Sequence, residues 1–276
     1  YTPRVGEWRP IRYDWNMYSA DKFIDQYLDS FARTHRQKFS RGESPLPKLR
    51  DIETLNEQLL TLFFPGHQGT ENMRSLRSVV GYSMQIFTRL LCDSIKLALI
   101  YESPEISEAL AEGQAAEHTD ALAAELGSIR AMLKKDAAAG FEGDPAADSI
   151  HEIILSYPGI KAIAVNRTAH FLYKRHVPLI PRMMAEAMHQ KTGIDIHPGA
   201  EIGESFFIDH GTGASIGETA VIGDRVRIYQ GVAIGAFSES SRIKGKTKRH
   251  PTIGDDVIIY PNASILGDIT VGNGSI

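Results

Sequence analysis

The last third of the chain repeats with a period of six residues, and this period constrains the fold more than any other feature. Aliphatic residues occupy the repeated position, and glycine often follows them. The repeated positions are Ile196, Ile202 and Ile208, then Ile216, Ile222, Ile228 and Ile234, and finally Ile253, Ile259, Ile265 and Val271. A period of six fits neither an α-helix nor a flat hairpin. It predicts a solenoid whose coils have three short flat sides, with the aliphatic side chains stacked inside.

Residues from about 21 to 192 carry a helical pattern instead. Apolar side chains recur three or four positions apart, and Gly193 ends the last predicted helix. The stretch 140–146 contains two glycines and a proline and is interpreted as a loop between helices. The sequence therefore predicts an α+β chain, with an all-α domain over residues 1–192 and an all-β solenoid over residues 193–276. The chain stops within a repeat, so we expect the solenoid to be truncated at its C-terminus.

Composition narrows the class of protein. The net charge of -4 provides no basic excess for nucleic-acid phosphates, so no nucleic-acid partner is expected. The single cysteine, Cys92, excludes internal disulfides and fits a reducing compartment, and its helical surroundings predict a buried, inert thiol. No apolar run approaches the roughly 20 residues that span a bilayer, and no secretory pattern opens the chain. The expected location is the cytoplasm, with no membrane partner.

Interruptions of the repeat are the places where side chains can leave the flat faces of a solenoid. Asp195 lies where the coils begin, Asp209 and His210 lie at a two-residue expansion, and an insertion over residues 236–249 precedes His250. A neutral imidazole is the usual base for removing an alcohol proton near pH 7, so His210 is a candidate base. Asp195 lies about one coil earlier and is the candidate carboxylate that orients the ring. A plain surface histidine is the alternative.

The insertion itself is basic. It carries five basic residues and one acidic residue between Ala236 and Arg249. Such a loop could hold the phosphates of coenzyme A, or it could be a solvated surface loop, and the residues leave both interpretations open.

The repeat resembles that of the hexapeptide-repeat acyltransferases, whose fold is a left-handed parallel β-helix. Members of that superfamily usually form trimers with active sites between neighbouring prisms. Within it, the coil is similar to the serine acetyltransferase family over about residues 141–276. The matching segments are 193–200, 208–213, 216–220, 230–232 and 249–251, and, upstream, 144–146 with a helix that carries Arg167, Ala169 and His170.

This resemblance implies an acetyl-CoA-dependent O-acetyltransferase that acetylates the hydroxyl of serine, giving O-acetylserine for cysteine biosynthesis. It implies that His210 takes the hydroxyl proton and that Asp195 is its orienting partner. It also implies that His250 lies across the cleft, contributed by the adjacent subunit, where it binds substrate and stabilises charge.

The remaining site residues also follow from the resemblance. Asp144 and Asp209 would hold the serine ammonium group, and Arg249 would hold the serine carboxylate. The implied contacts with coenzyme A are Gly235, Ala236, Lys244, Lys246 and Lys248. Here the chain departs from the family, because residues 235–238 read Gly-Ala-Phe-Ser where Gly-Gly-Thr-Gly is common, and the following loop is longer.

The implied assembly is a homotrimer or a dimer of trimers. Many family members end in a tail that docks into O-acetylserine sulfhydrylase, and the resemblance implies this enzyme as a partner through a C-terminal tail that residues 1–276 do not include. The alternatives are an acetyltransferase for another small alcohol or amine, such as homoserine or a sugar, and a non-catalytic hexapeptide-repeat scaffold. No metal is expected, because His197, His210 and His250 lack the close pair, five residues apart, found in hexapeptide-repeat carbonic anhydrases.

Overall fold

The computed structural model describes residues 24, 27, 46–67, 75–237 and 247–276. The chain divides into two compact units, Tyr1–Pro45 and Leu46–Ile276, and every element described below belongs to the second. The predicted coenzyme A contacts Lys244 and Lys246 lie outside the described residues, as does the start of the chain. No helix in the described ranges is long and apolar enough to cross a membrane.

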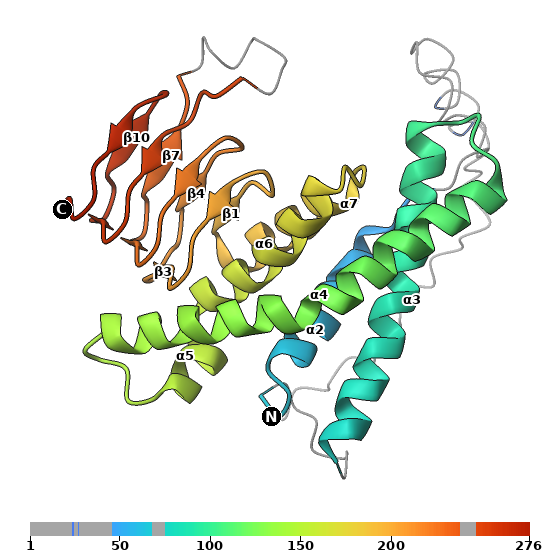
Figure 1. Cartoon of the computed structure of the whole chain (residues 1–276), viewed down its shortest axis with the longest axis horizontal. Coiled ribbons are helices and arrows are strands. Elements are labelled where there is room, and N and C mark those ends of the chain that lie inside the picture. The colour runs from blue at the N-terminus through green and yellow to red at the C-terminus, as the bar shows by residue number, and fades with distance from the viewer. Residues whose placement is uncertain (1–23, 25–26, 28–45, 68–74, 238–246) are drawn as a thin grey trace, which may run out of the picture. The chain divides into compact units, whose positions relative to one another are not determined.

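Helices fill the described part of the second unit up to residue 192 (Figure 1). They are α2 (Leu49–Phe63), α3 (Leu76–Glu102), α4 (Glu108–Gly143), α5 (Ile150–Ser156), α6 (Pro158–Lys174) and α7 (Ile180–Thr192). Serine side chains accept a backbone N–H at the N-termini of α3, α4 and α5, and proline stands in the first turn of α6 and α7. Gly193 ends α7 in the left-handed conformation, as predicted.

Two local predictions in the helical region need correction. The predicted loop over residues 140–146 exists between α4 and α5, but it begins only after Gly143, where α4 ends. Gly140 lies where α4 packs closely, since a Cβ atom there would stand 3.1 Å from Ile153 and 3.3 Å from Phe207. Cys92 is half-buried in α3 rather than fully buried, and its burial raises the pKa of the thiol. That shift keeps the thiol protonated, in agreement with the predicted inert side chain.

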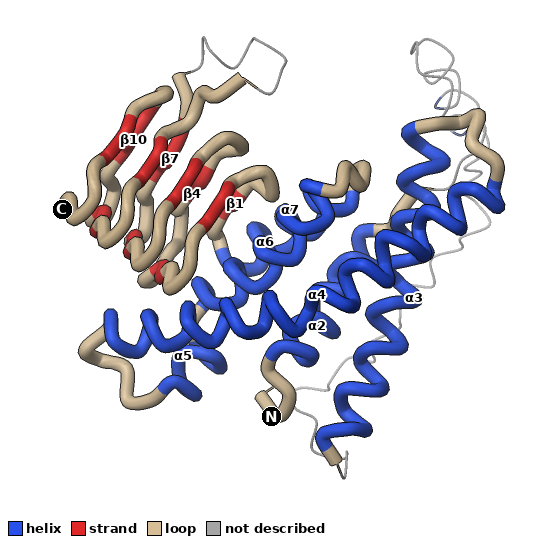
Figure 2. Tube along the Cα trace, in the orientation of Figure 1, coloured by secondary structure: helices blue, strands red, loops and turns tan. Residues whose placement is uncertain are grey.

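The six-residue repeat forms a parallel coil, which confirms the solenoid (Figure 2). Its strands are β1 (Asp195–Ile196), β2 (Glu201–Ile202), β3 (Phe207–Ile208), β4 (Ser215–Ile216), β5 (Val221–Ile222), β6 (Arg227–Ile228), β7 (Ala233–Gly235), β8 (Thr252–Ile253), β9 (Ile258–Ile259), β10 (Ser264–Leu266) and β11 (Thr270–Val271). They form three sheets, in the orders β1-β4-β7-β10, β2-β5-β8-β11 and β3-β6-β9. Repeated isoleucines pair with one another from coil to coil, as Ile216 does with Ile234, and both of these side chains are buried inside the coil.

The two-residue expansion has a defined register. Ile208 pairs with Ile228, 20 positions later, whereas Ser215 pairs with Ala233, 18 positions later. The earlier coil therefore holds two more residues than the later one between these pairs, in the segment that contains His210 and Gly211. Both have positive φ angles, 55° and 81°, so the backbone turns outward at this point. The expansion thus carries the imidazole of His210 away from the flat face.

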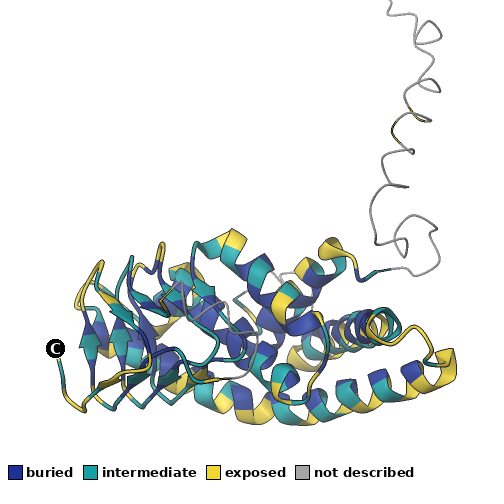
Figure 3. Cartoon of the chain, turned by 90° about the horizontal axis from the view of Figure 1, so that it is seen from above, coloured by how far each residue is buried: buried dark blue, intermediate teal, exposed yellow. Residues whose placement is uncertain are grey.

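A buried ion pair joins the helices to the coil. The guanidinium of Arg167 in α6 contacts both carboxylate oxygens of Asp136 in α4 at 2.8 Å. It also donates to Ile202 O and Gly203 O, while Asp136 accepts the N–H of Phe206. The buried core is continuous through the helices and the coil, as the dark blue residues of Figure 3 show. The α+β architecture is confirmed, whereas the domain boundary at residue 192 stays a prediction.

Candidate active site

Asp144, Asp209 and His210 come together at the edge of the coil where the expansion lies. Asp209 Oδ1 is 3.9 Å from His210 Nε2. Asp144 caps the C-terminus of α4, and its carboxylate accepts the O–H of Tyr157 and, at 2.8 Å, the N–H of Ala146. These two donors hold the pKa of Asp144 below its usual value. The Asp144 carboxylate contributes to the raised pKa of Asp209, for which burial is the larger cause.

One oxygen of the Asp209 carboxylate lacks a hydrogen bond. This atom, Oδ1, is buried and has no hydrogen-bond partner among the described residues. The side chain of His210 is 71% exposed beside it. A buried carboxylate oxygen without a partner costs free energy, and a cationic group with N–H donors removes that cost. This edge of the coil therefore suits an ammonium group next to an accessible imidazole.

A second cluster surrounds Arg249. Its guanidinium forms an ion pair with Glu218, which also accepts the O–H of Tyr173 at 2.8 Å. Burial acts against ionisation of Glu218, but the hydrogen bonds from Arg249 and Tyr173 prevail and lower its pKa. Burial and, after it, the hydrogen bond to Glu218 raise the pKa of Tyr173 to about 12. One ion pair leaves other guanidinium donors for a carboxylate.

The protonation state of His250 is fixed by Thr219. The Thr219 hydroxyl accepts the backbone N–H groups of Arg249 and His250, so its own proton is free for His250 Nδ1 at 2.9 Å. The N–H of Thr219 also donates to Nδ1, at 3.1 Å. Nδ1 is therefore the acceptor, and the neutral ring carries its proton on Nε2. Burial and the neighbouring Arg249 lower the pKa of His250, which keeps the ring a neutral N–H donor.

The ring of His250 lies against the backbone of Gly217. A Cβ atom at Gly217 would stand 2.8 Å from His250 Cγ and would overlap with Cδ2 and Nε2. The glycine thus provides the space in which the buried imidazole lies.

Asp195 has other neighbours than the predicted one. No hydrogen bond or ion pair between Asp195 and His210 occurs in the ranges that the structure describes. Ligand atoms of Asp195, Glu186 and His189 lie within 4.8 Å of one another, and Glu186 is ion-paired with Arg182. His197 has structural contacts: Nδ1 accepts the N–H of Gly199, and the ring packs edge-on against Tyr173.

The described coenzyme A candidates differ in their surroundings. Gly235 is the last residue of β7, where it pairs with Leu266, and Ala236 follows at the start of the insertion. The Lys248 ammonium donates to Thr219 O at 2.7 Å and to Pro251 O at 3.2 Å. Burial lowers the pKa of Lys248. Lys248 therefore stabilises the segment around His250, and two of its N–H donors are already engaged with backbone carbonyls.

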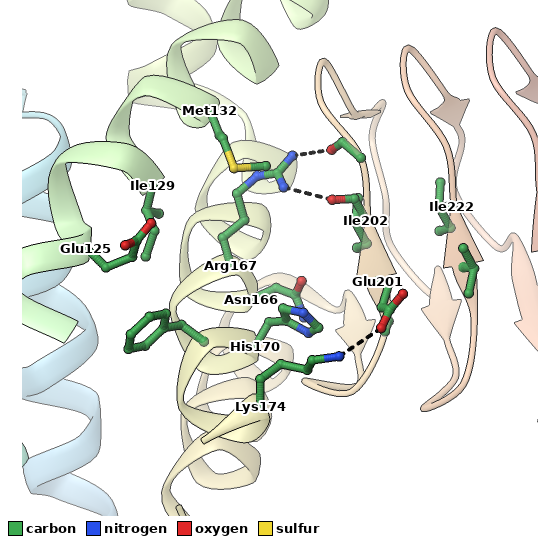
Figure 4. A pocket seen from close by; sticks show the side chains of 14 residues that line it. Glu125, Ile129, Met132, Asn166, Arg167, His170, Lys174, Glu201, Ile202 and Ile222 are labelled. Carbon is green, nitrogen blue, oxygen red and sulfur yellow. Dashed lines mark hydrogen bonds and ion pairs between the residues drawn. The ribbon is translucent and has the colours of Figure 1, made fainter. Parts of the chain in front are cut away.

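A cavity of about 540 Å³ lies elsewhere, between α4, α6 and the strands β2 and β5 (Figure 4). Its lining includes Arg167, His170, Lys174 and Glu201, and Lys174 is ion-paired with Glu201. None of the predicted site residues lines it. The candidate site thus lies on open edges of the coil rather than in this cavity.

Sequence reasoning missed Tyr157, Tyr173, Glu218 and Thr219 as parts of these clusters. Glu218 and Thr219 lie within the matching segment 216–220 and could have been singled out there. The two tyrosines stand at the ends of α6 and reach the site only through packing, so the sequence gives no sign of their role.

Comparisons with known proteins show relatives of the chain. The chain is 46% identical over 243 residues to a serine acetyltransferase of Synechococcus elongatus, covering 84% of this chain and 76% of that protein. Its structure matches serine acetyltransferase isoform 3 of Entamoeba histolytica in complex with cysteine, with a TM-score of 0.70 and 36% identity. The match covers 91% of this chain and 83% of that chain. It also matches the coenzyme A complex of serine acetyltransferase from Brucella abortus, with a TM-score of 0.53 and 27% identity. This match covers 83% of this chain and 87% of that chain. No protein-family model matches the chain.

A parallel six-residue coil with an imidazole beside two carboxylates, in a chain with these relatives, defines an acetyl-CoA-dependent acyltransferase. More particularly, the chain belongs to the serine acetyltransferase family.

Proposed function

We propose that this chain transfers the acetyl group of acetyl-CoA to the hydroxyl of serine, giving O-acetylserine. The observation that supports this acceptor best is the buried Oδ1 of Asp209, which has no hydrogen-bond partner among the described residues, with Asp144 nearby and His210 Nε2 3.9 Å away. Two carboxylates can bind the ammonium of an amino acid, and the imidazole is then in reach of a hydroxyl whose oxygen lies three bonds from the ammonium nitrogen. A sugar acceptor has no ammonium group to require this pair.

In the proposed reaction, His210 accepts the proton of the serine hydroxyl while the oxygen bonds to the thioester carbonyl carbon. The tetrahedral intermediate collapses, the carbon–sulfur bond breaks, and the coenzyme A thiolate takes the proton from the imidazolium. The Nε2–H of His250 suits stabilisation of the negative charge on the carbonyl oxygen, because Thr219 holds the ring neutral with the proton on that nitrogen. None of these reaction steps requires a metal ion.

The other residues complete the acceptor site. Arg249, held by Glu218, offers its remaining guanidinium donors to the serine carboxylate. Asp195 is the proposed orienting partner of His210. The strand of Asp195 pairs with β4 directly beneath the expansion, and the N–H of Asp195 donates to Ala214 O at 2.9 Å. Gly235, Ala236 and the lysines of the insertion are the proposed coenzyme A contacts.

The proposed assembly is a homotrimer or a dimer of trimers of left-handed coils, with each active site shared by two subunits. Residues 209–213 precede β4, whereas the cluster of Glu218, Arg249 and His250 lies beyond its other end. Because β4 separates the two clusters within one chain, a neighbouring copy is needed to place His250 opposite His210. A cytoplasmic location and docking to O-acetylserine sulfhydrylase stay predictions.

The test is release of thiol from acetyl-CoA with serine, homoserine and a sugar as acceptors. We expect serine to be preferred and His210→Ala to lower kcat by about 10²–10⁴-fold, the usual value of general-base catalysis. His176→Ala is the matched control, because His176 is also exposed and has a positive φ of 59°. Wild-type turnover in His210→Ala would remove His210 from the reaction.

Subunit mixing tests the shared site in the same assay. His210→Ala and His250→Ala subunits are each expected to be nearly inactive, whereas co-assembled mixtures regain about a quarter of the wild-type sites. No recovery on co-assembly would place both histidines in one subunit's site.

A further inference from the structure

We propose that Arg227 is a positioning residue for the acceptor amino acid: it holds the end of α4, and with it Asp144, in place beside Asp209. In this way it sets the affinity for the ammonium group without touching the substrate. The inference rests on the proposed function, because that function assigns the ammonium to Asp144 and Asp209.

The contacts of Arg227 connect the coil with the end of α4. Arg227 is the outward-facing residue of β6, and it pairs in register with Phe207 of β3. Its guanidinium carbon lies 5.7 Å from the centroid of the Phe207 ring. Nη1 donates to Gly143 O at 2.7 Å, and Gly143 is the last residue of α4, directly before Asp144. The arginine thus stacks on the coil and holds the C-terminal carbonyl of the helix.

Gly143 fits this contact closely. A Cβ atom at residue 143 would stand 2.7 Å from Nη2 of Arg227, 2.9 Å from its guanidinium carbon and 2.9 Å from the Phe207 ring. Any other residue would push the guanidinium away from the carbonyl. The absence of a side chain is therefore what lets Arg227 reach the backbone immediately before Asp144.

The charge of Arg227 also acts on the two carboxylates. Asp144 and Asp209 repel one another, and the nearby guanidinium favours the ionised form of both, opposing that repulsion. Among the described residues, Arg227 donates to neither carboxylate, and its Nη1 donates to Gly143 O instead. The guanidinium thus favours the charge on both carboxylates without occupying either one.

Arg225 offers a matched comparison within the same strand region. It lies two residues earlier and carries the same charge, but its guanidinium is exposed and paired with Asp256 at 2.6 Å and 2.9 Å. If Arg227 served only general packing or surface charge, loss of either arginine would affect acceptor affinity to a similar, small extent.

The experiment measures kcat and both KM values for Arg227→Met, Arg227→Lys, Gly143→Ala and the control Arg225→Met. We expect Arg227→Met to raise the KM for serine about 10-fold, the size of one lost hydrogen bond from a charged donor. Its kcat and its KM for acetyl-CoA should stay within about 2-fold of wild type. Gly143→Ala should raise the same KM with the charge retained, and Arg225→Met should behave as wild type.

The pH profile separates the two roles of the arginine. Loss of its charge raises the pKa of Asp144 and Asp209, so the acidic limb of kcat/KM for serine moves to higher pH in Arg227→Met. Arg227→Lys keeps the charge, and its limb should stay at the wild-type position while KM rises. Serine binding measured by calorimetry gives the same affinities without turnover.

Three results overturn parts of this account in distinguishable ways. A serine KM in Arg227→Met within about 2-fold of that in Arg225→Met refutes the positioning role. Should Arg227→Met fail to fold, wild-type serine affinity in both Arg227→Lys and Gly143→Ala refutes it equally. If the wild-type protein neither binds nor acetylates serine, the proposed function itself fails, whatever the variants do.

Discussion

The substitution Gly217→Ala should remove the proposed catalytic contribution of His250 while leaving that residue in the chain. The new Cβ atom would stand 2.8 Å from His250 Cγ, where ordinary contacts begin at 3.4 Å, and it would overlap with Cδ2 and Nε2. Gly217 is not one of the positions with positive φ, so alanine meets no backbone strain there. The imidazole has to move by roughly 1 Å, a displacement that can cost on the order of 100-fold in rate.

The same displacement breaks the two hydrogen bonds to Nδ1, from the Thr219 hydroxyl at 2.9 Å and the Thr219 N–H at 3.1 Å. At about 1 kcal/mol each, their loss lowers the free energy of unfolding by about 2 kcal/mol. We therefore expect kcat/KM to fall about 100-fold in a protein that still folds. Thiol release from acetyl-CoA measures the first effect, and denaturant unfolding measures the second.

A double-mutant cycle makes this prediction refutable. In the His250→Ala background the ring is absent, so Gly217→Ala should cause no further loss of activity. Gly272→Ala is the control, because a Cβ atom at that glycine meets nothing within 4 Å. Wild-type activity in Gly217→Ala, or an equal loss with and without the His250 ring, would show that Gly217 does not act through His250.

Two further outcomes follow from buried contacts. Thr219→Val removes a donor to His250 Nδ1 and so favours the protonated ring; the pKa of His250 rises and the acidic limb of kcat/KM moves to higher pH, whereas Thr219→Ser restores it. An unmoved limb in Thr219→Val would contradict this. Asp136→Asn leaves the buried Arg167 without its counter-ion and should lower the free energy of unfolding by about 3–5 kcal/mol. Lys135 forms a neighbouring but exposed ion pair with Glu204, so Lys135→Met should leave the free energy of unfolding, measured with denaturant, unchanged. Equal losses in the two variants would refute the argument.

Local pattern explains which parts of the fold were predictable. The six-residue period specifies the coil because every repeat places its isoleucine in the same inward position, and coil stacking then follows from burial alone. The helices from α2 to α7 follow from their own period and caps in the same way. The predicted loop began too early, at residue 140, because glycine commonly ends helices, whereas Gly140 lets α4 pack closely on Phe207 and Ile153.

In the candidate site, too, features that depend on neighbouring residues were predictable, and contacts between distant residues were not. The sequence by itself determined the coil and the exposed imidazole of His210, since both depend on residues close together in the chain. Only the tertiary structure decided that Asp144 meets Asp209, that Thr219 sets the tautomer of His250, and that Arg227 reaches the carbonyl before Asp144. These contacts join residues from about 30 to more than 80 positions apart. Coil stacking and the packing of α4 against β3 create them, and no local spacing records which side chains will then meet.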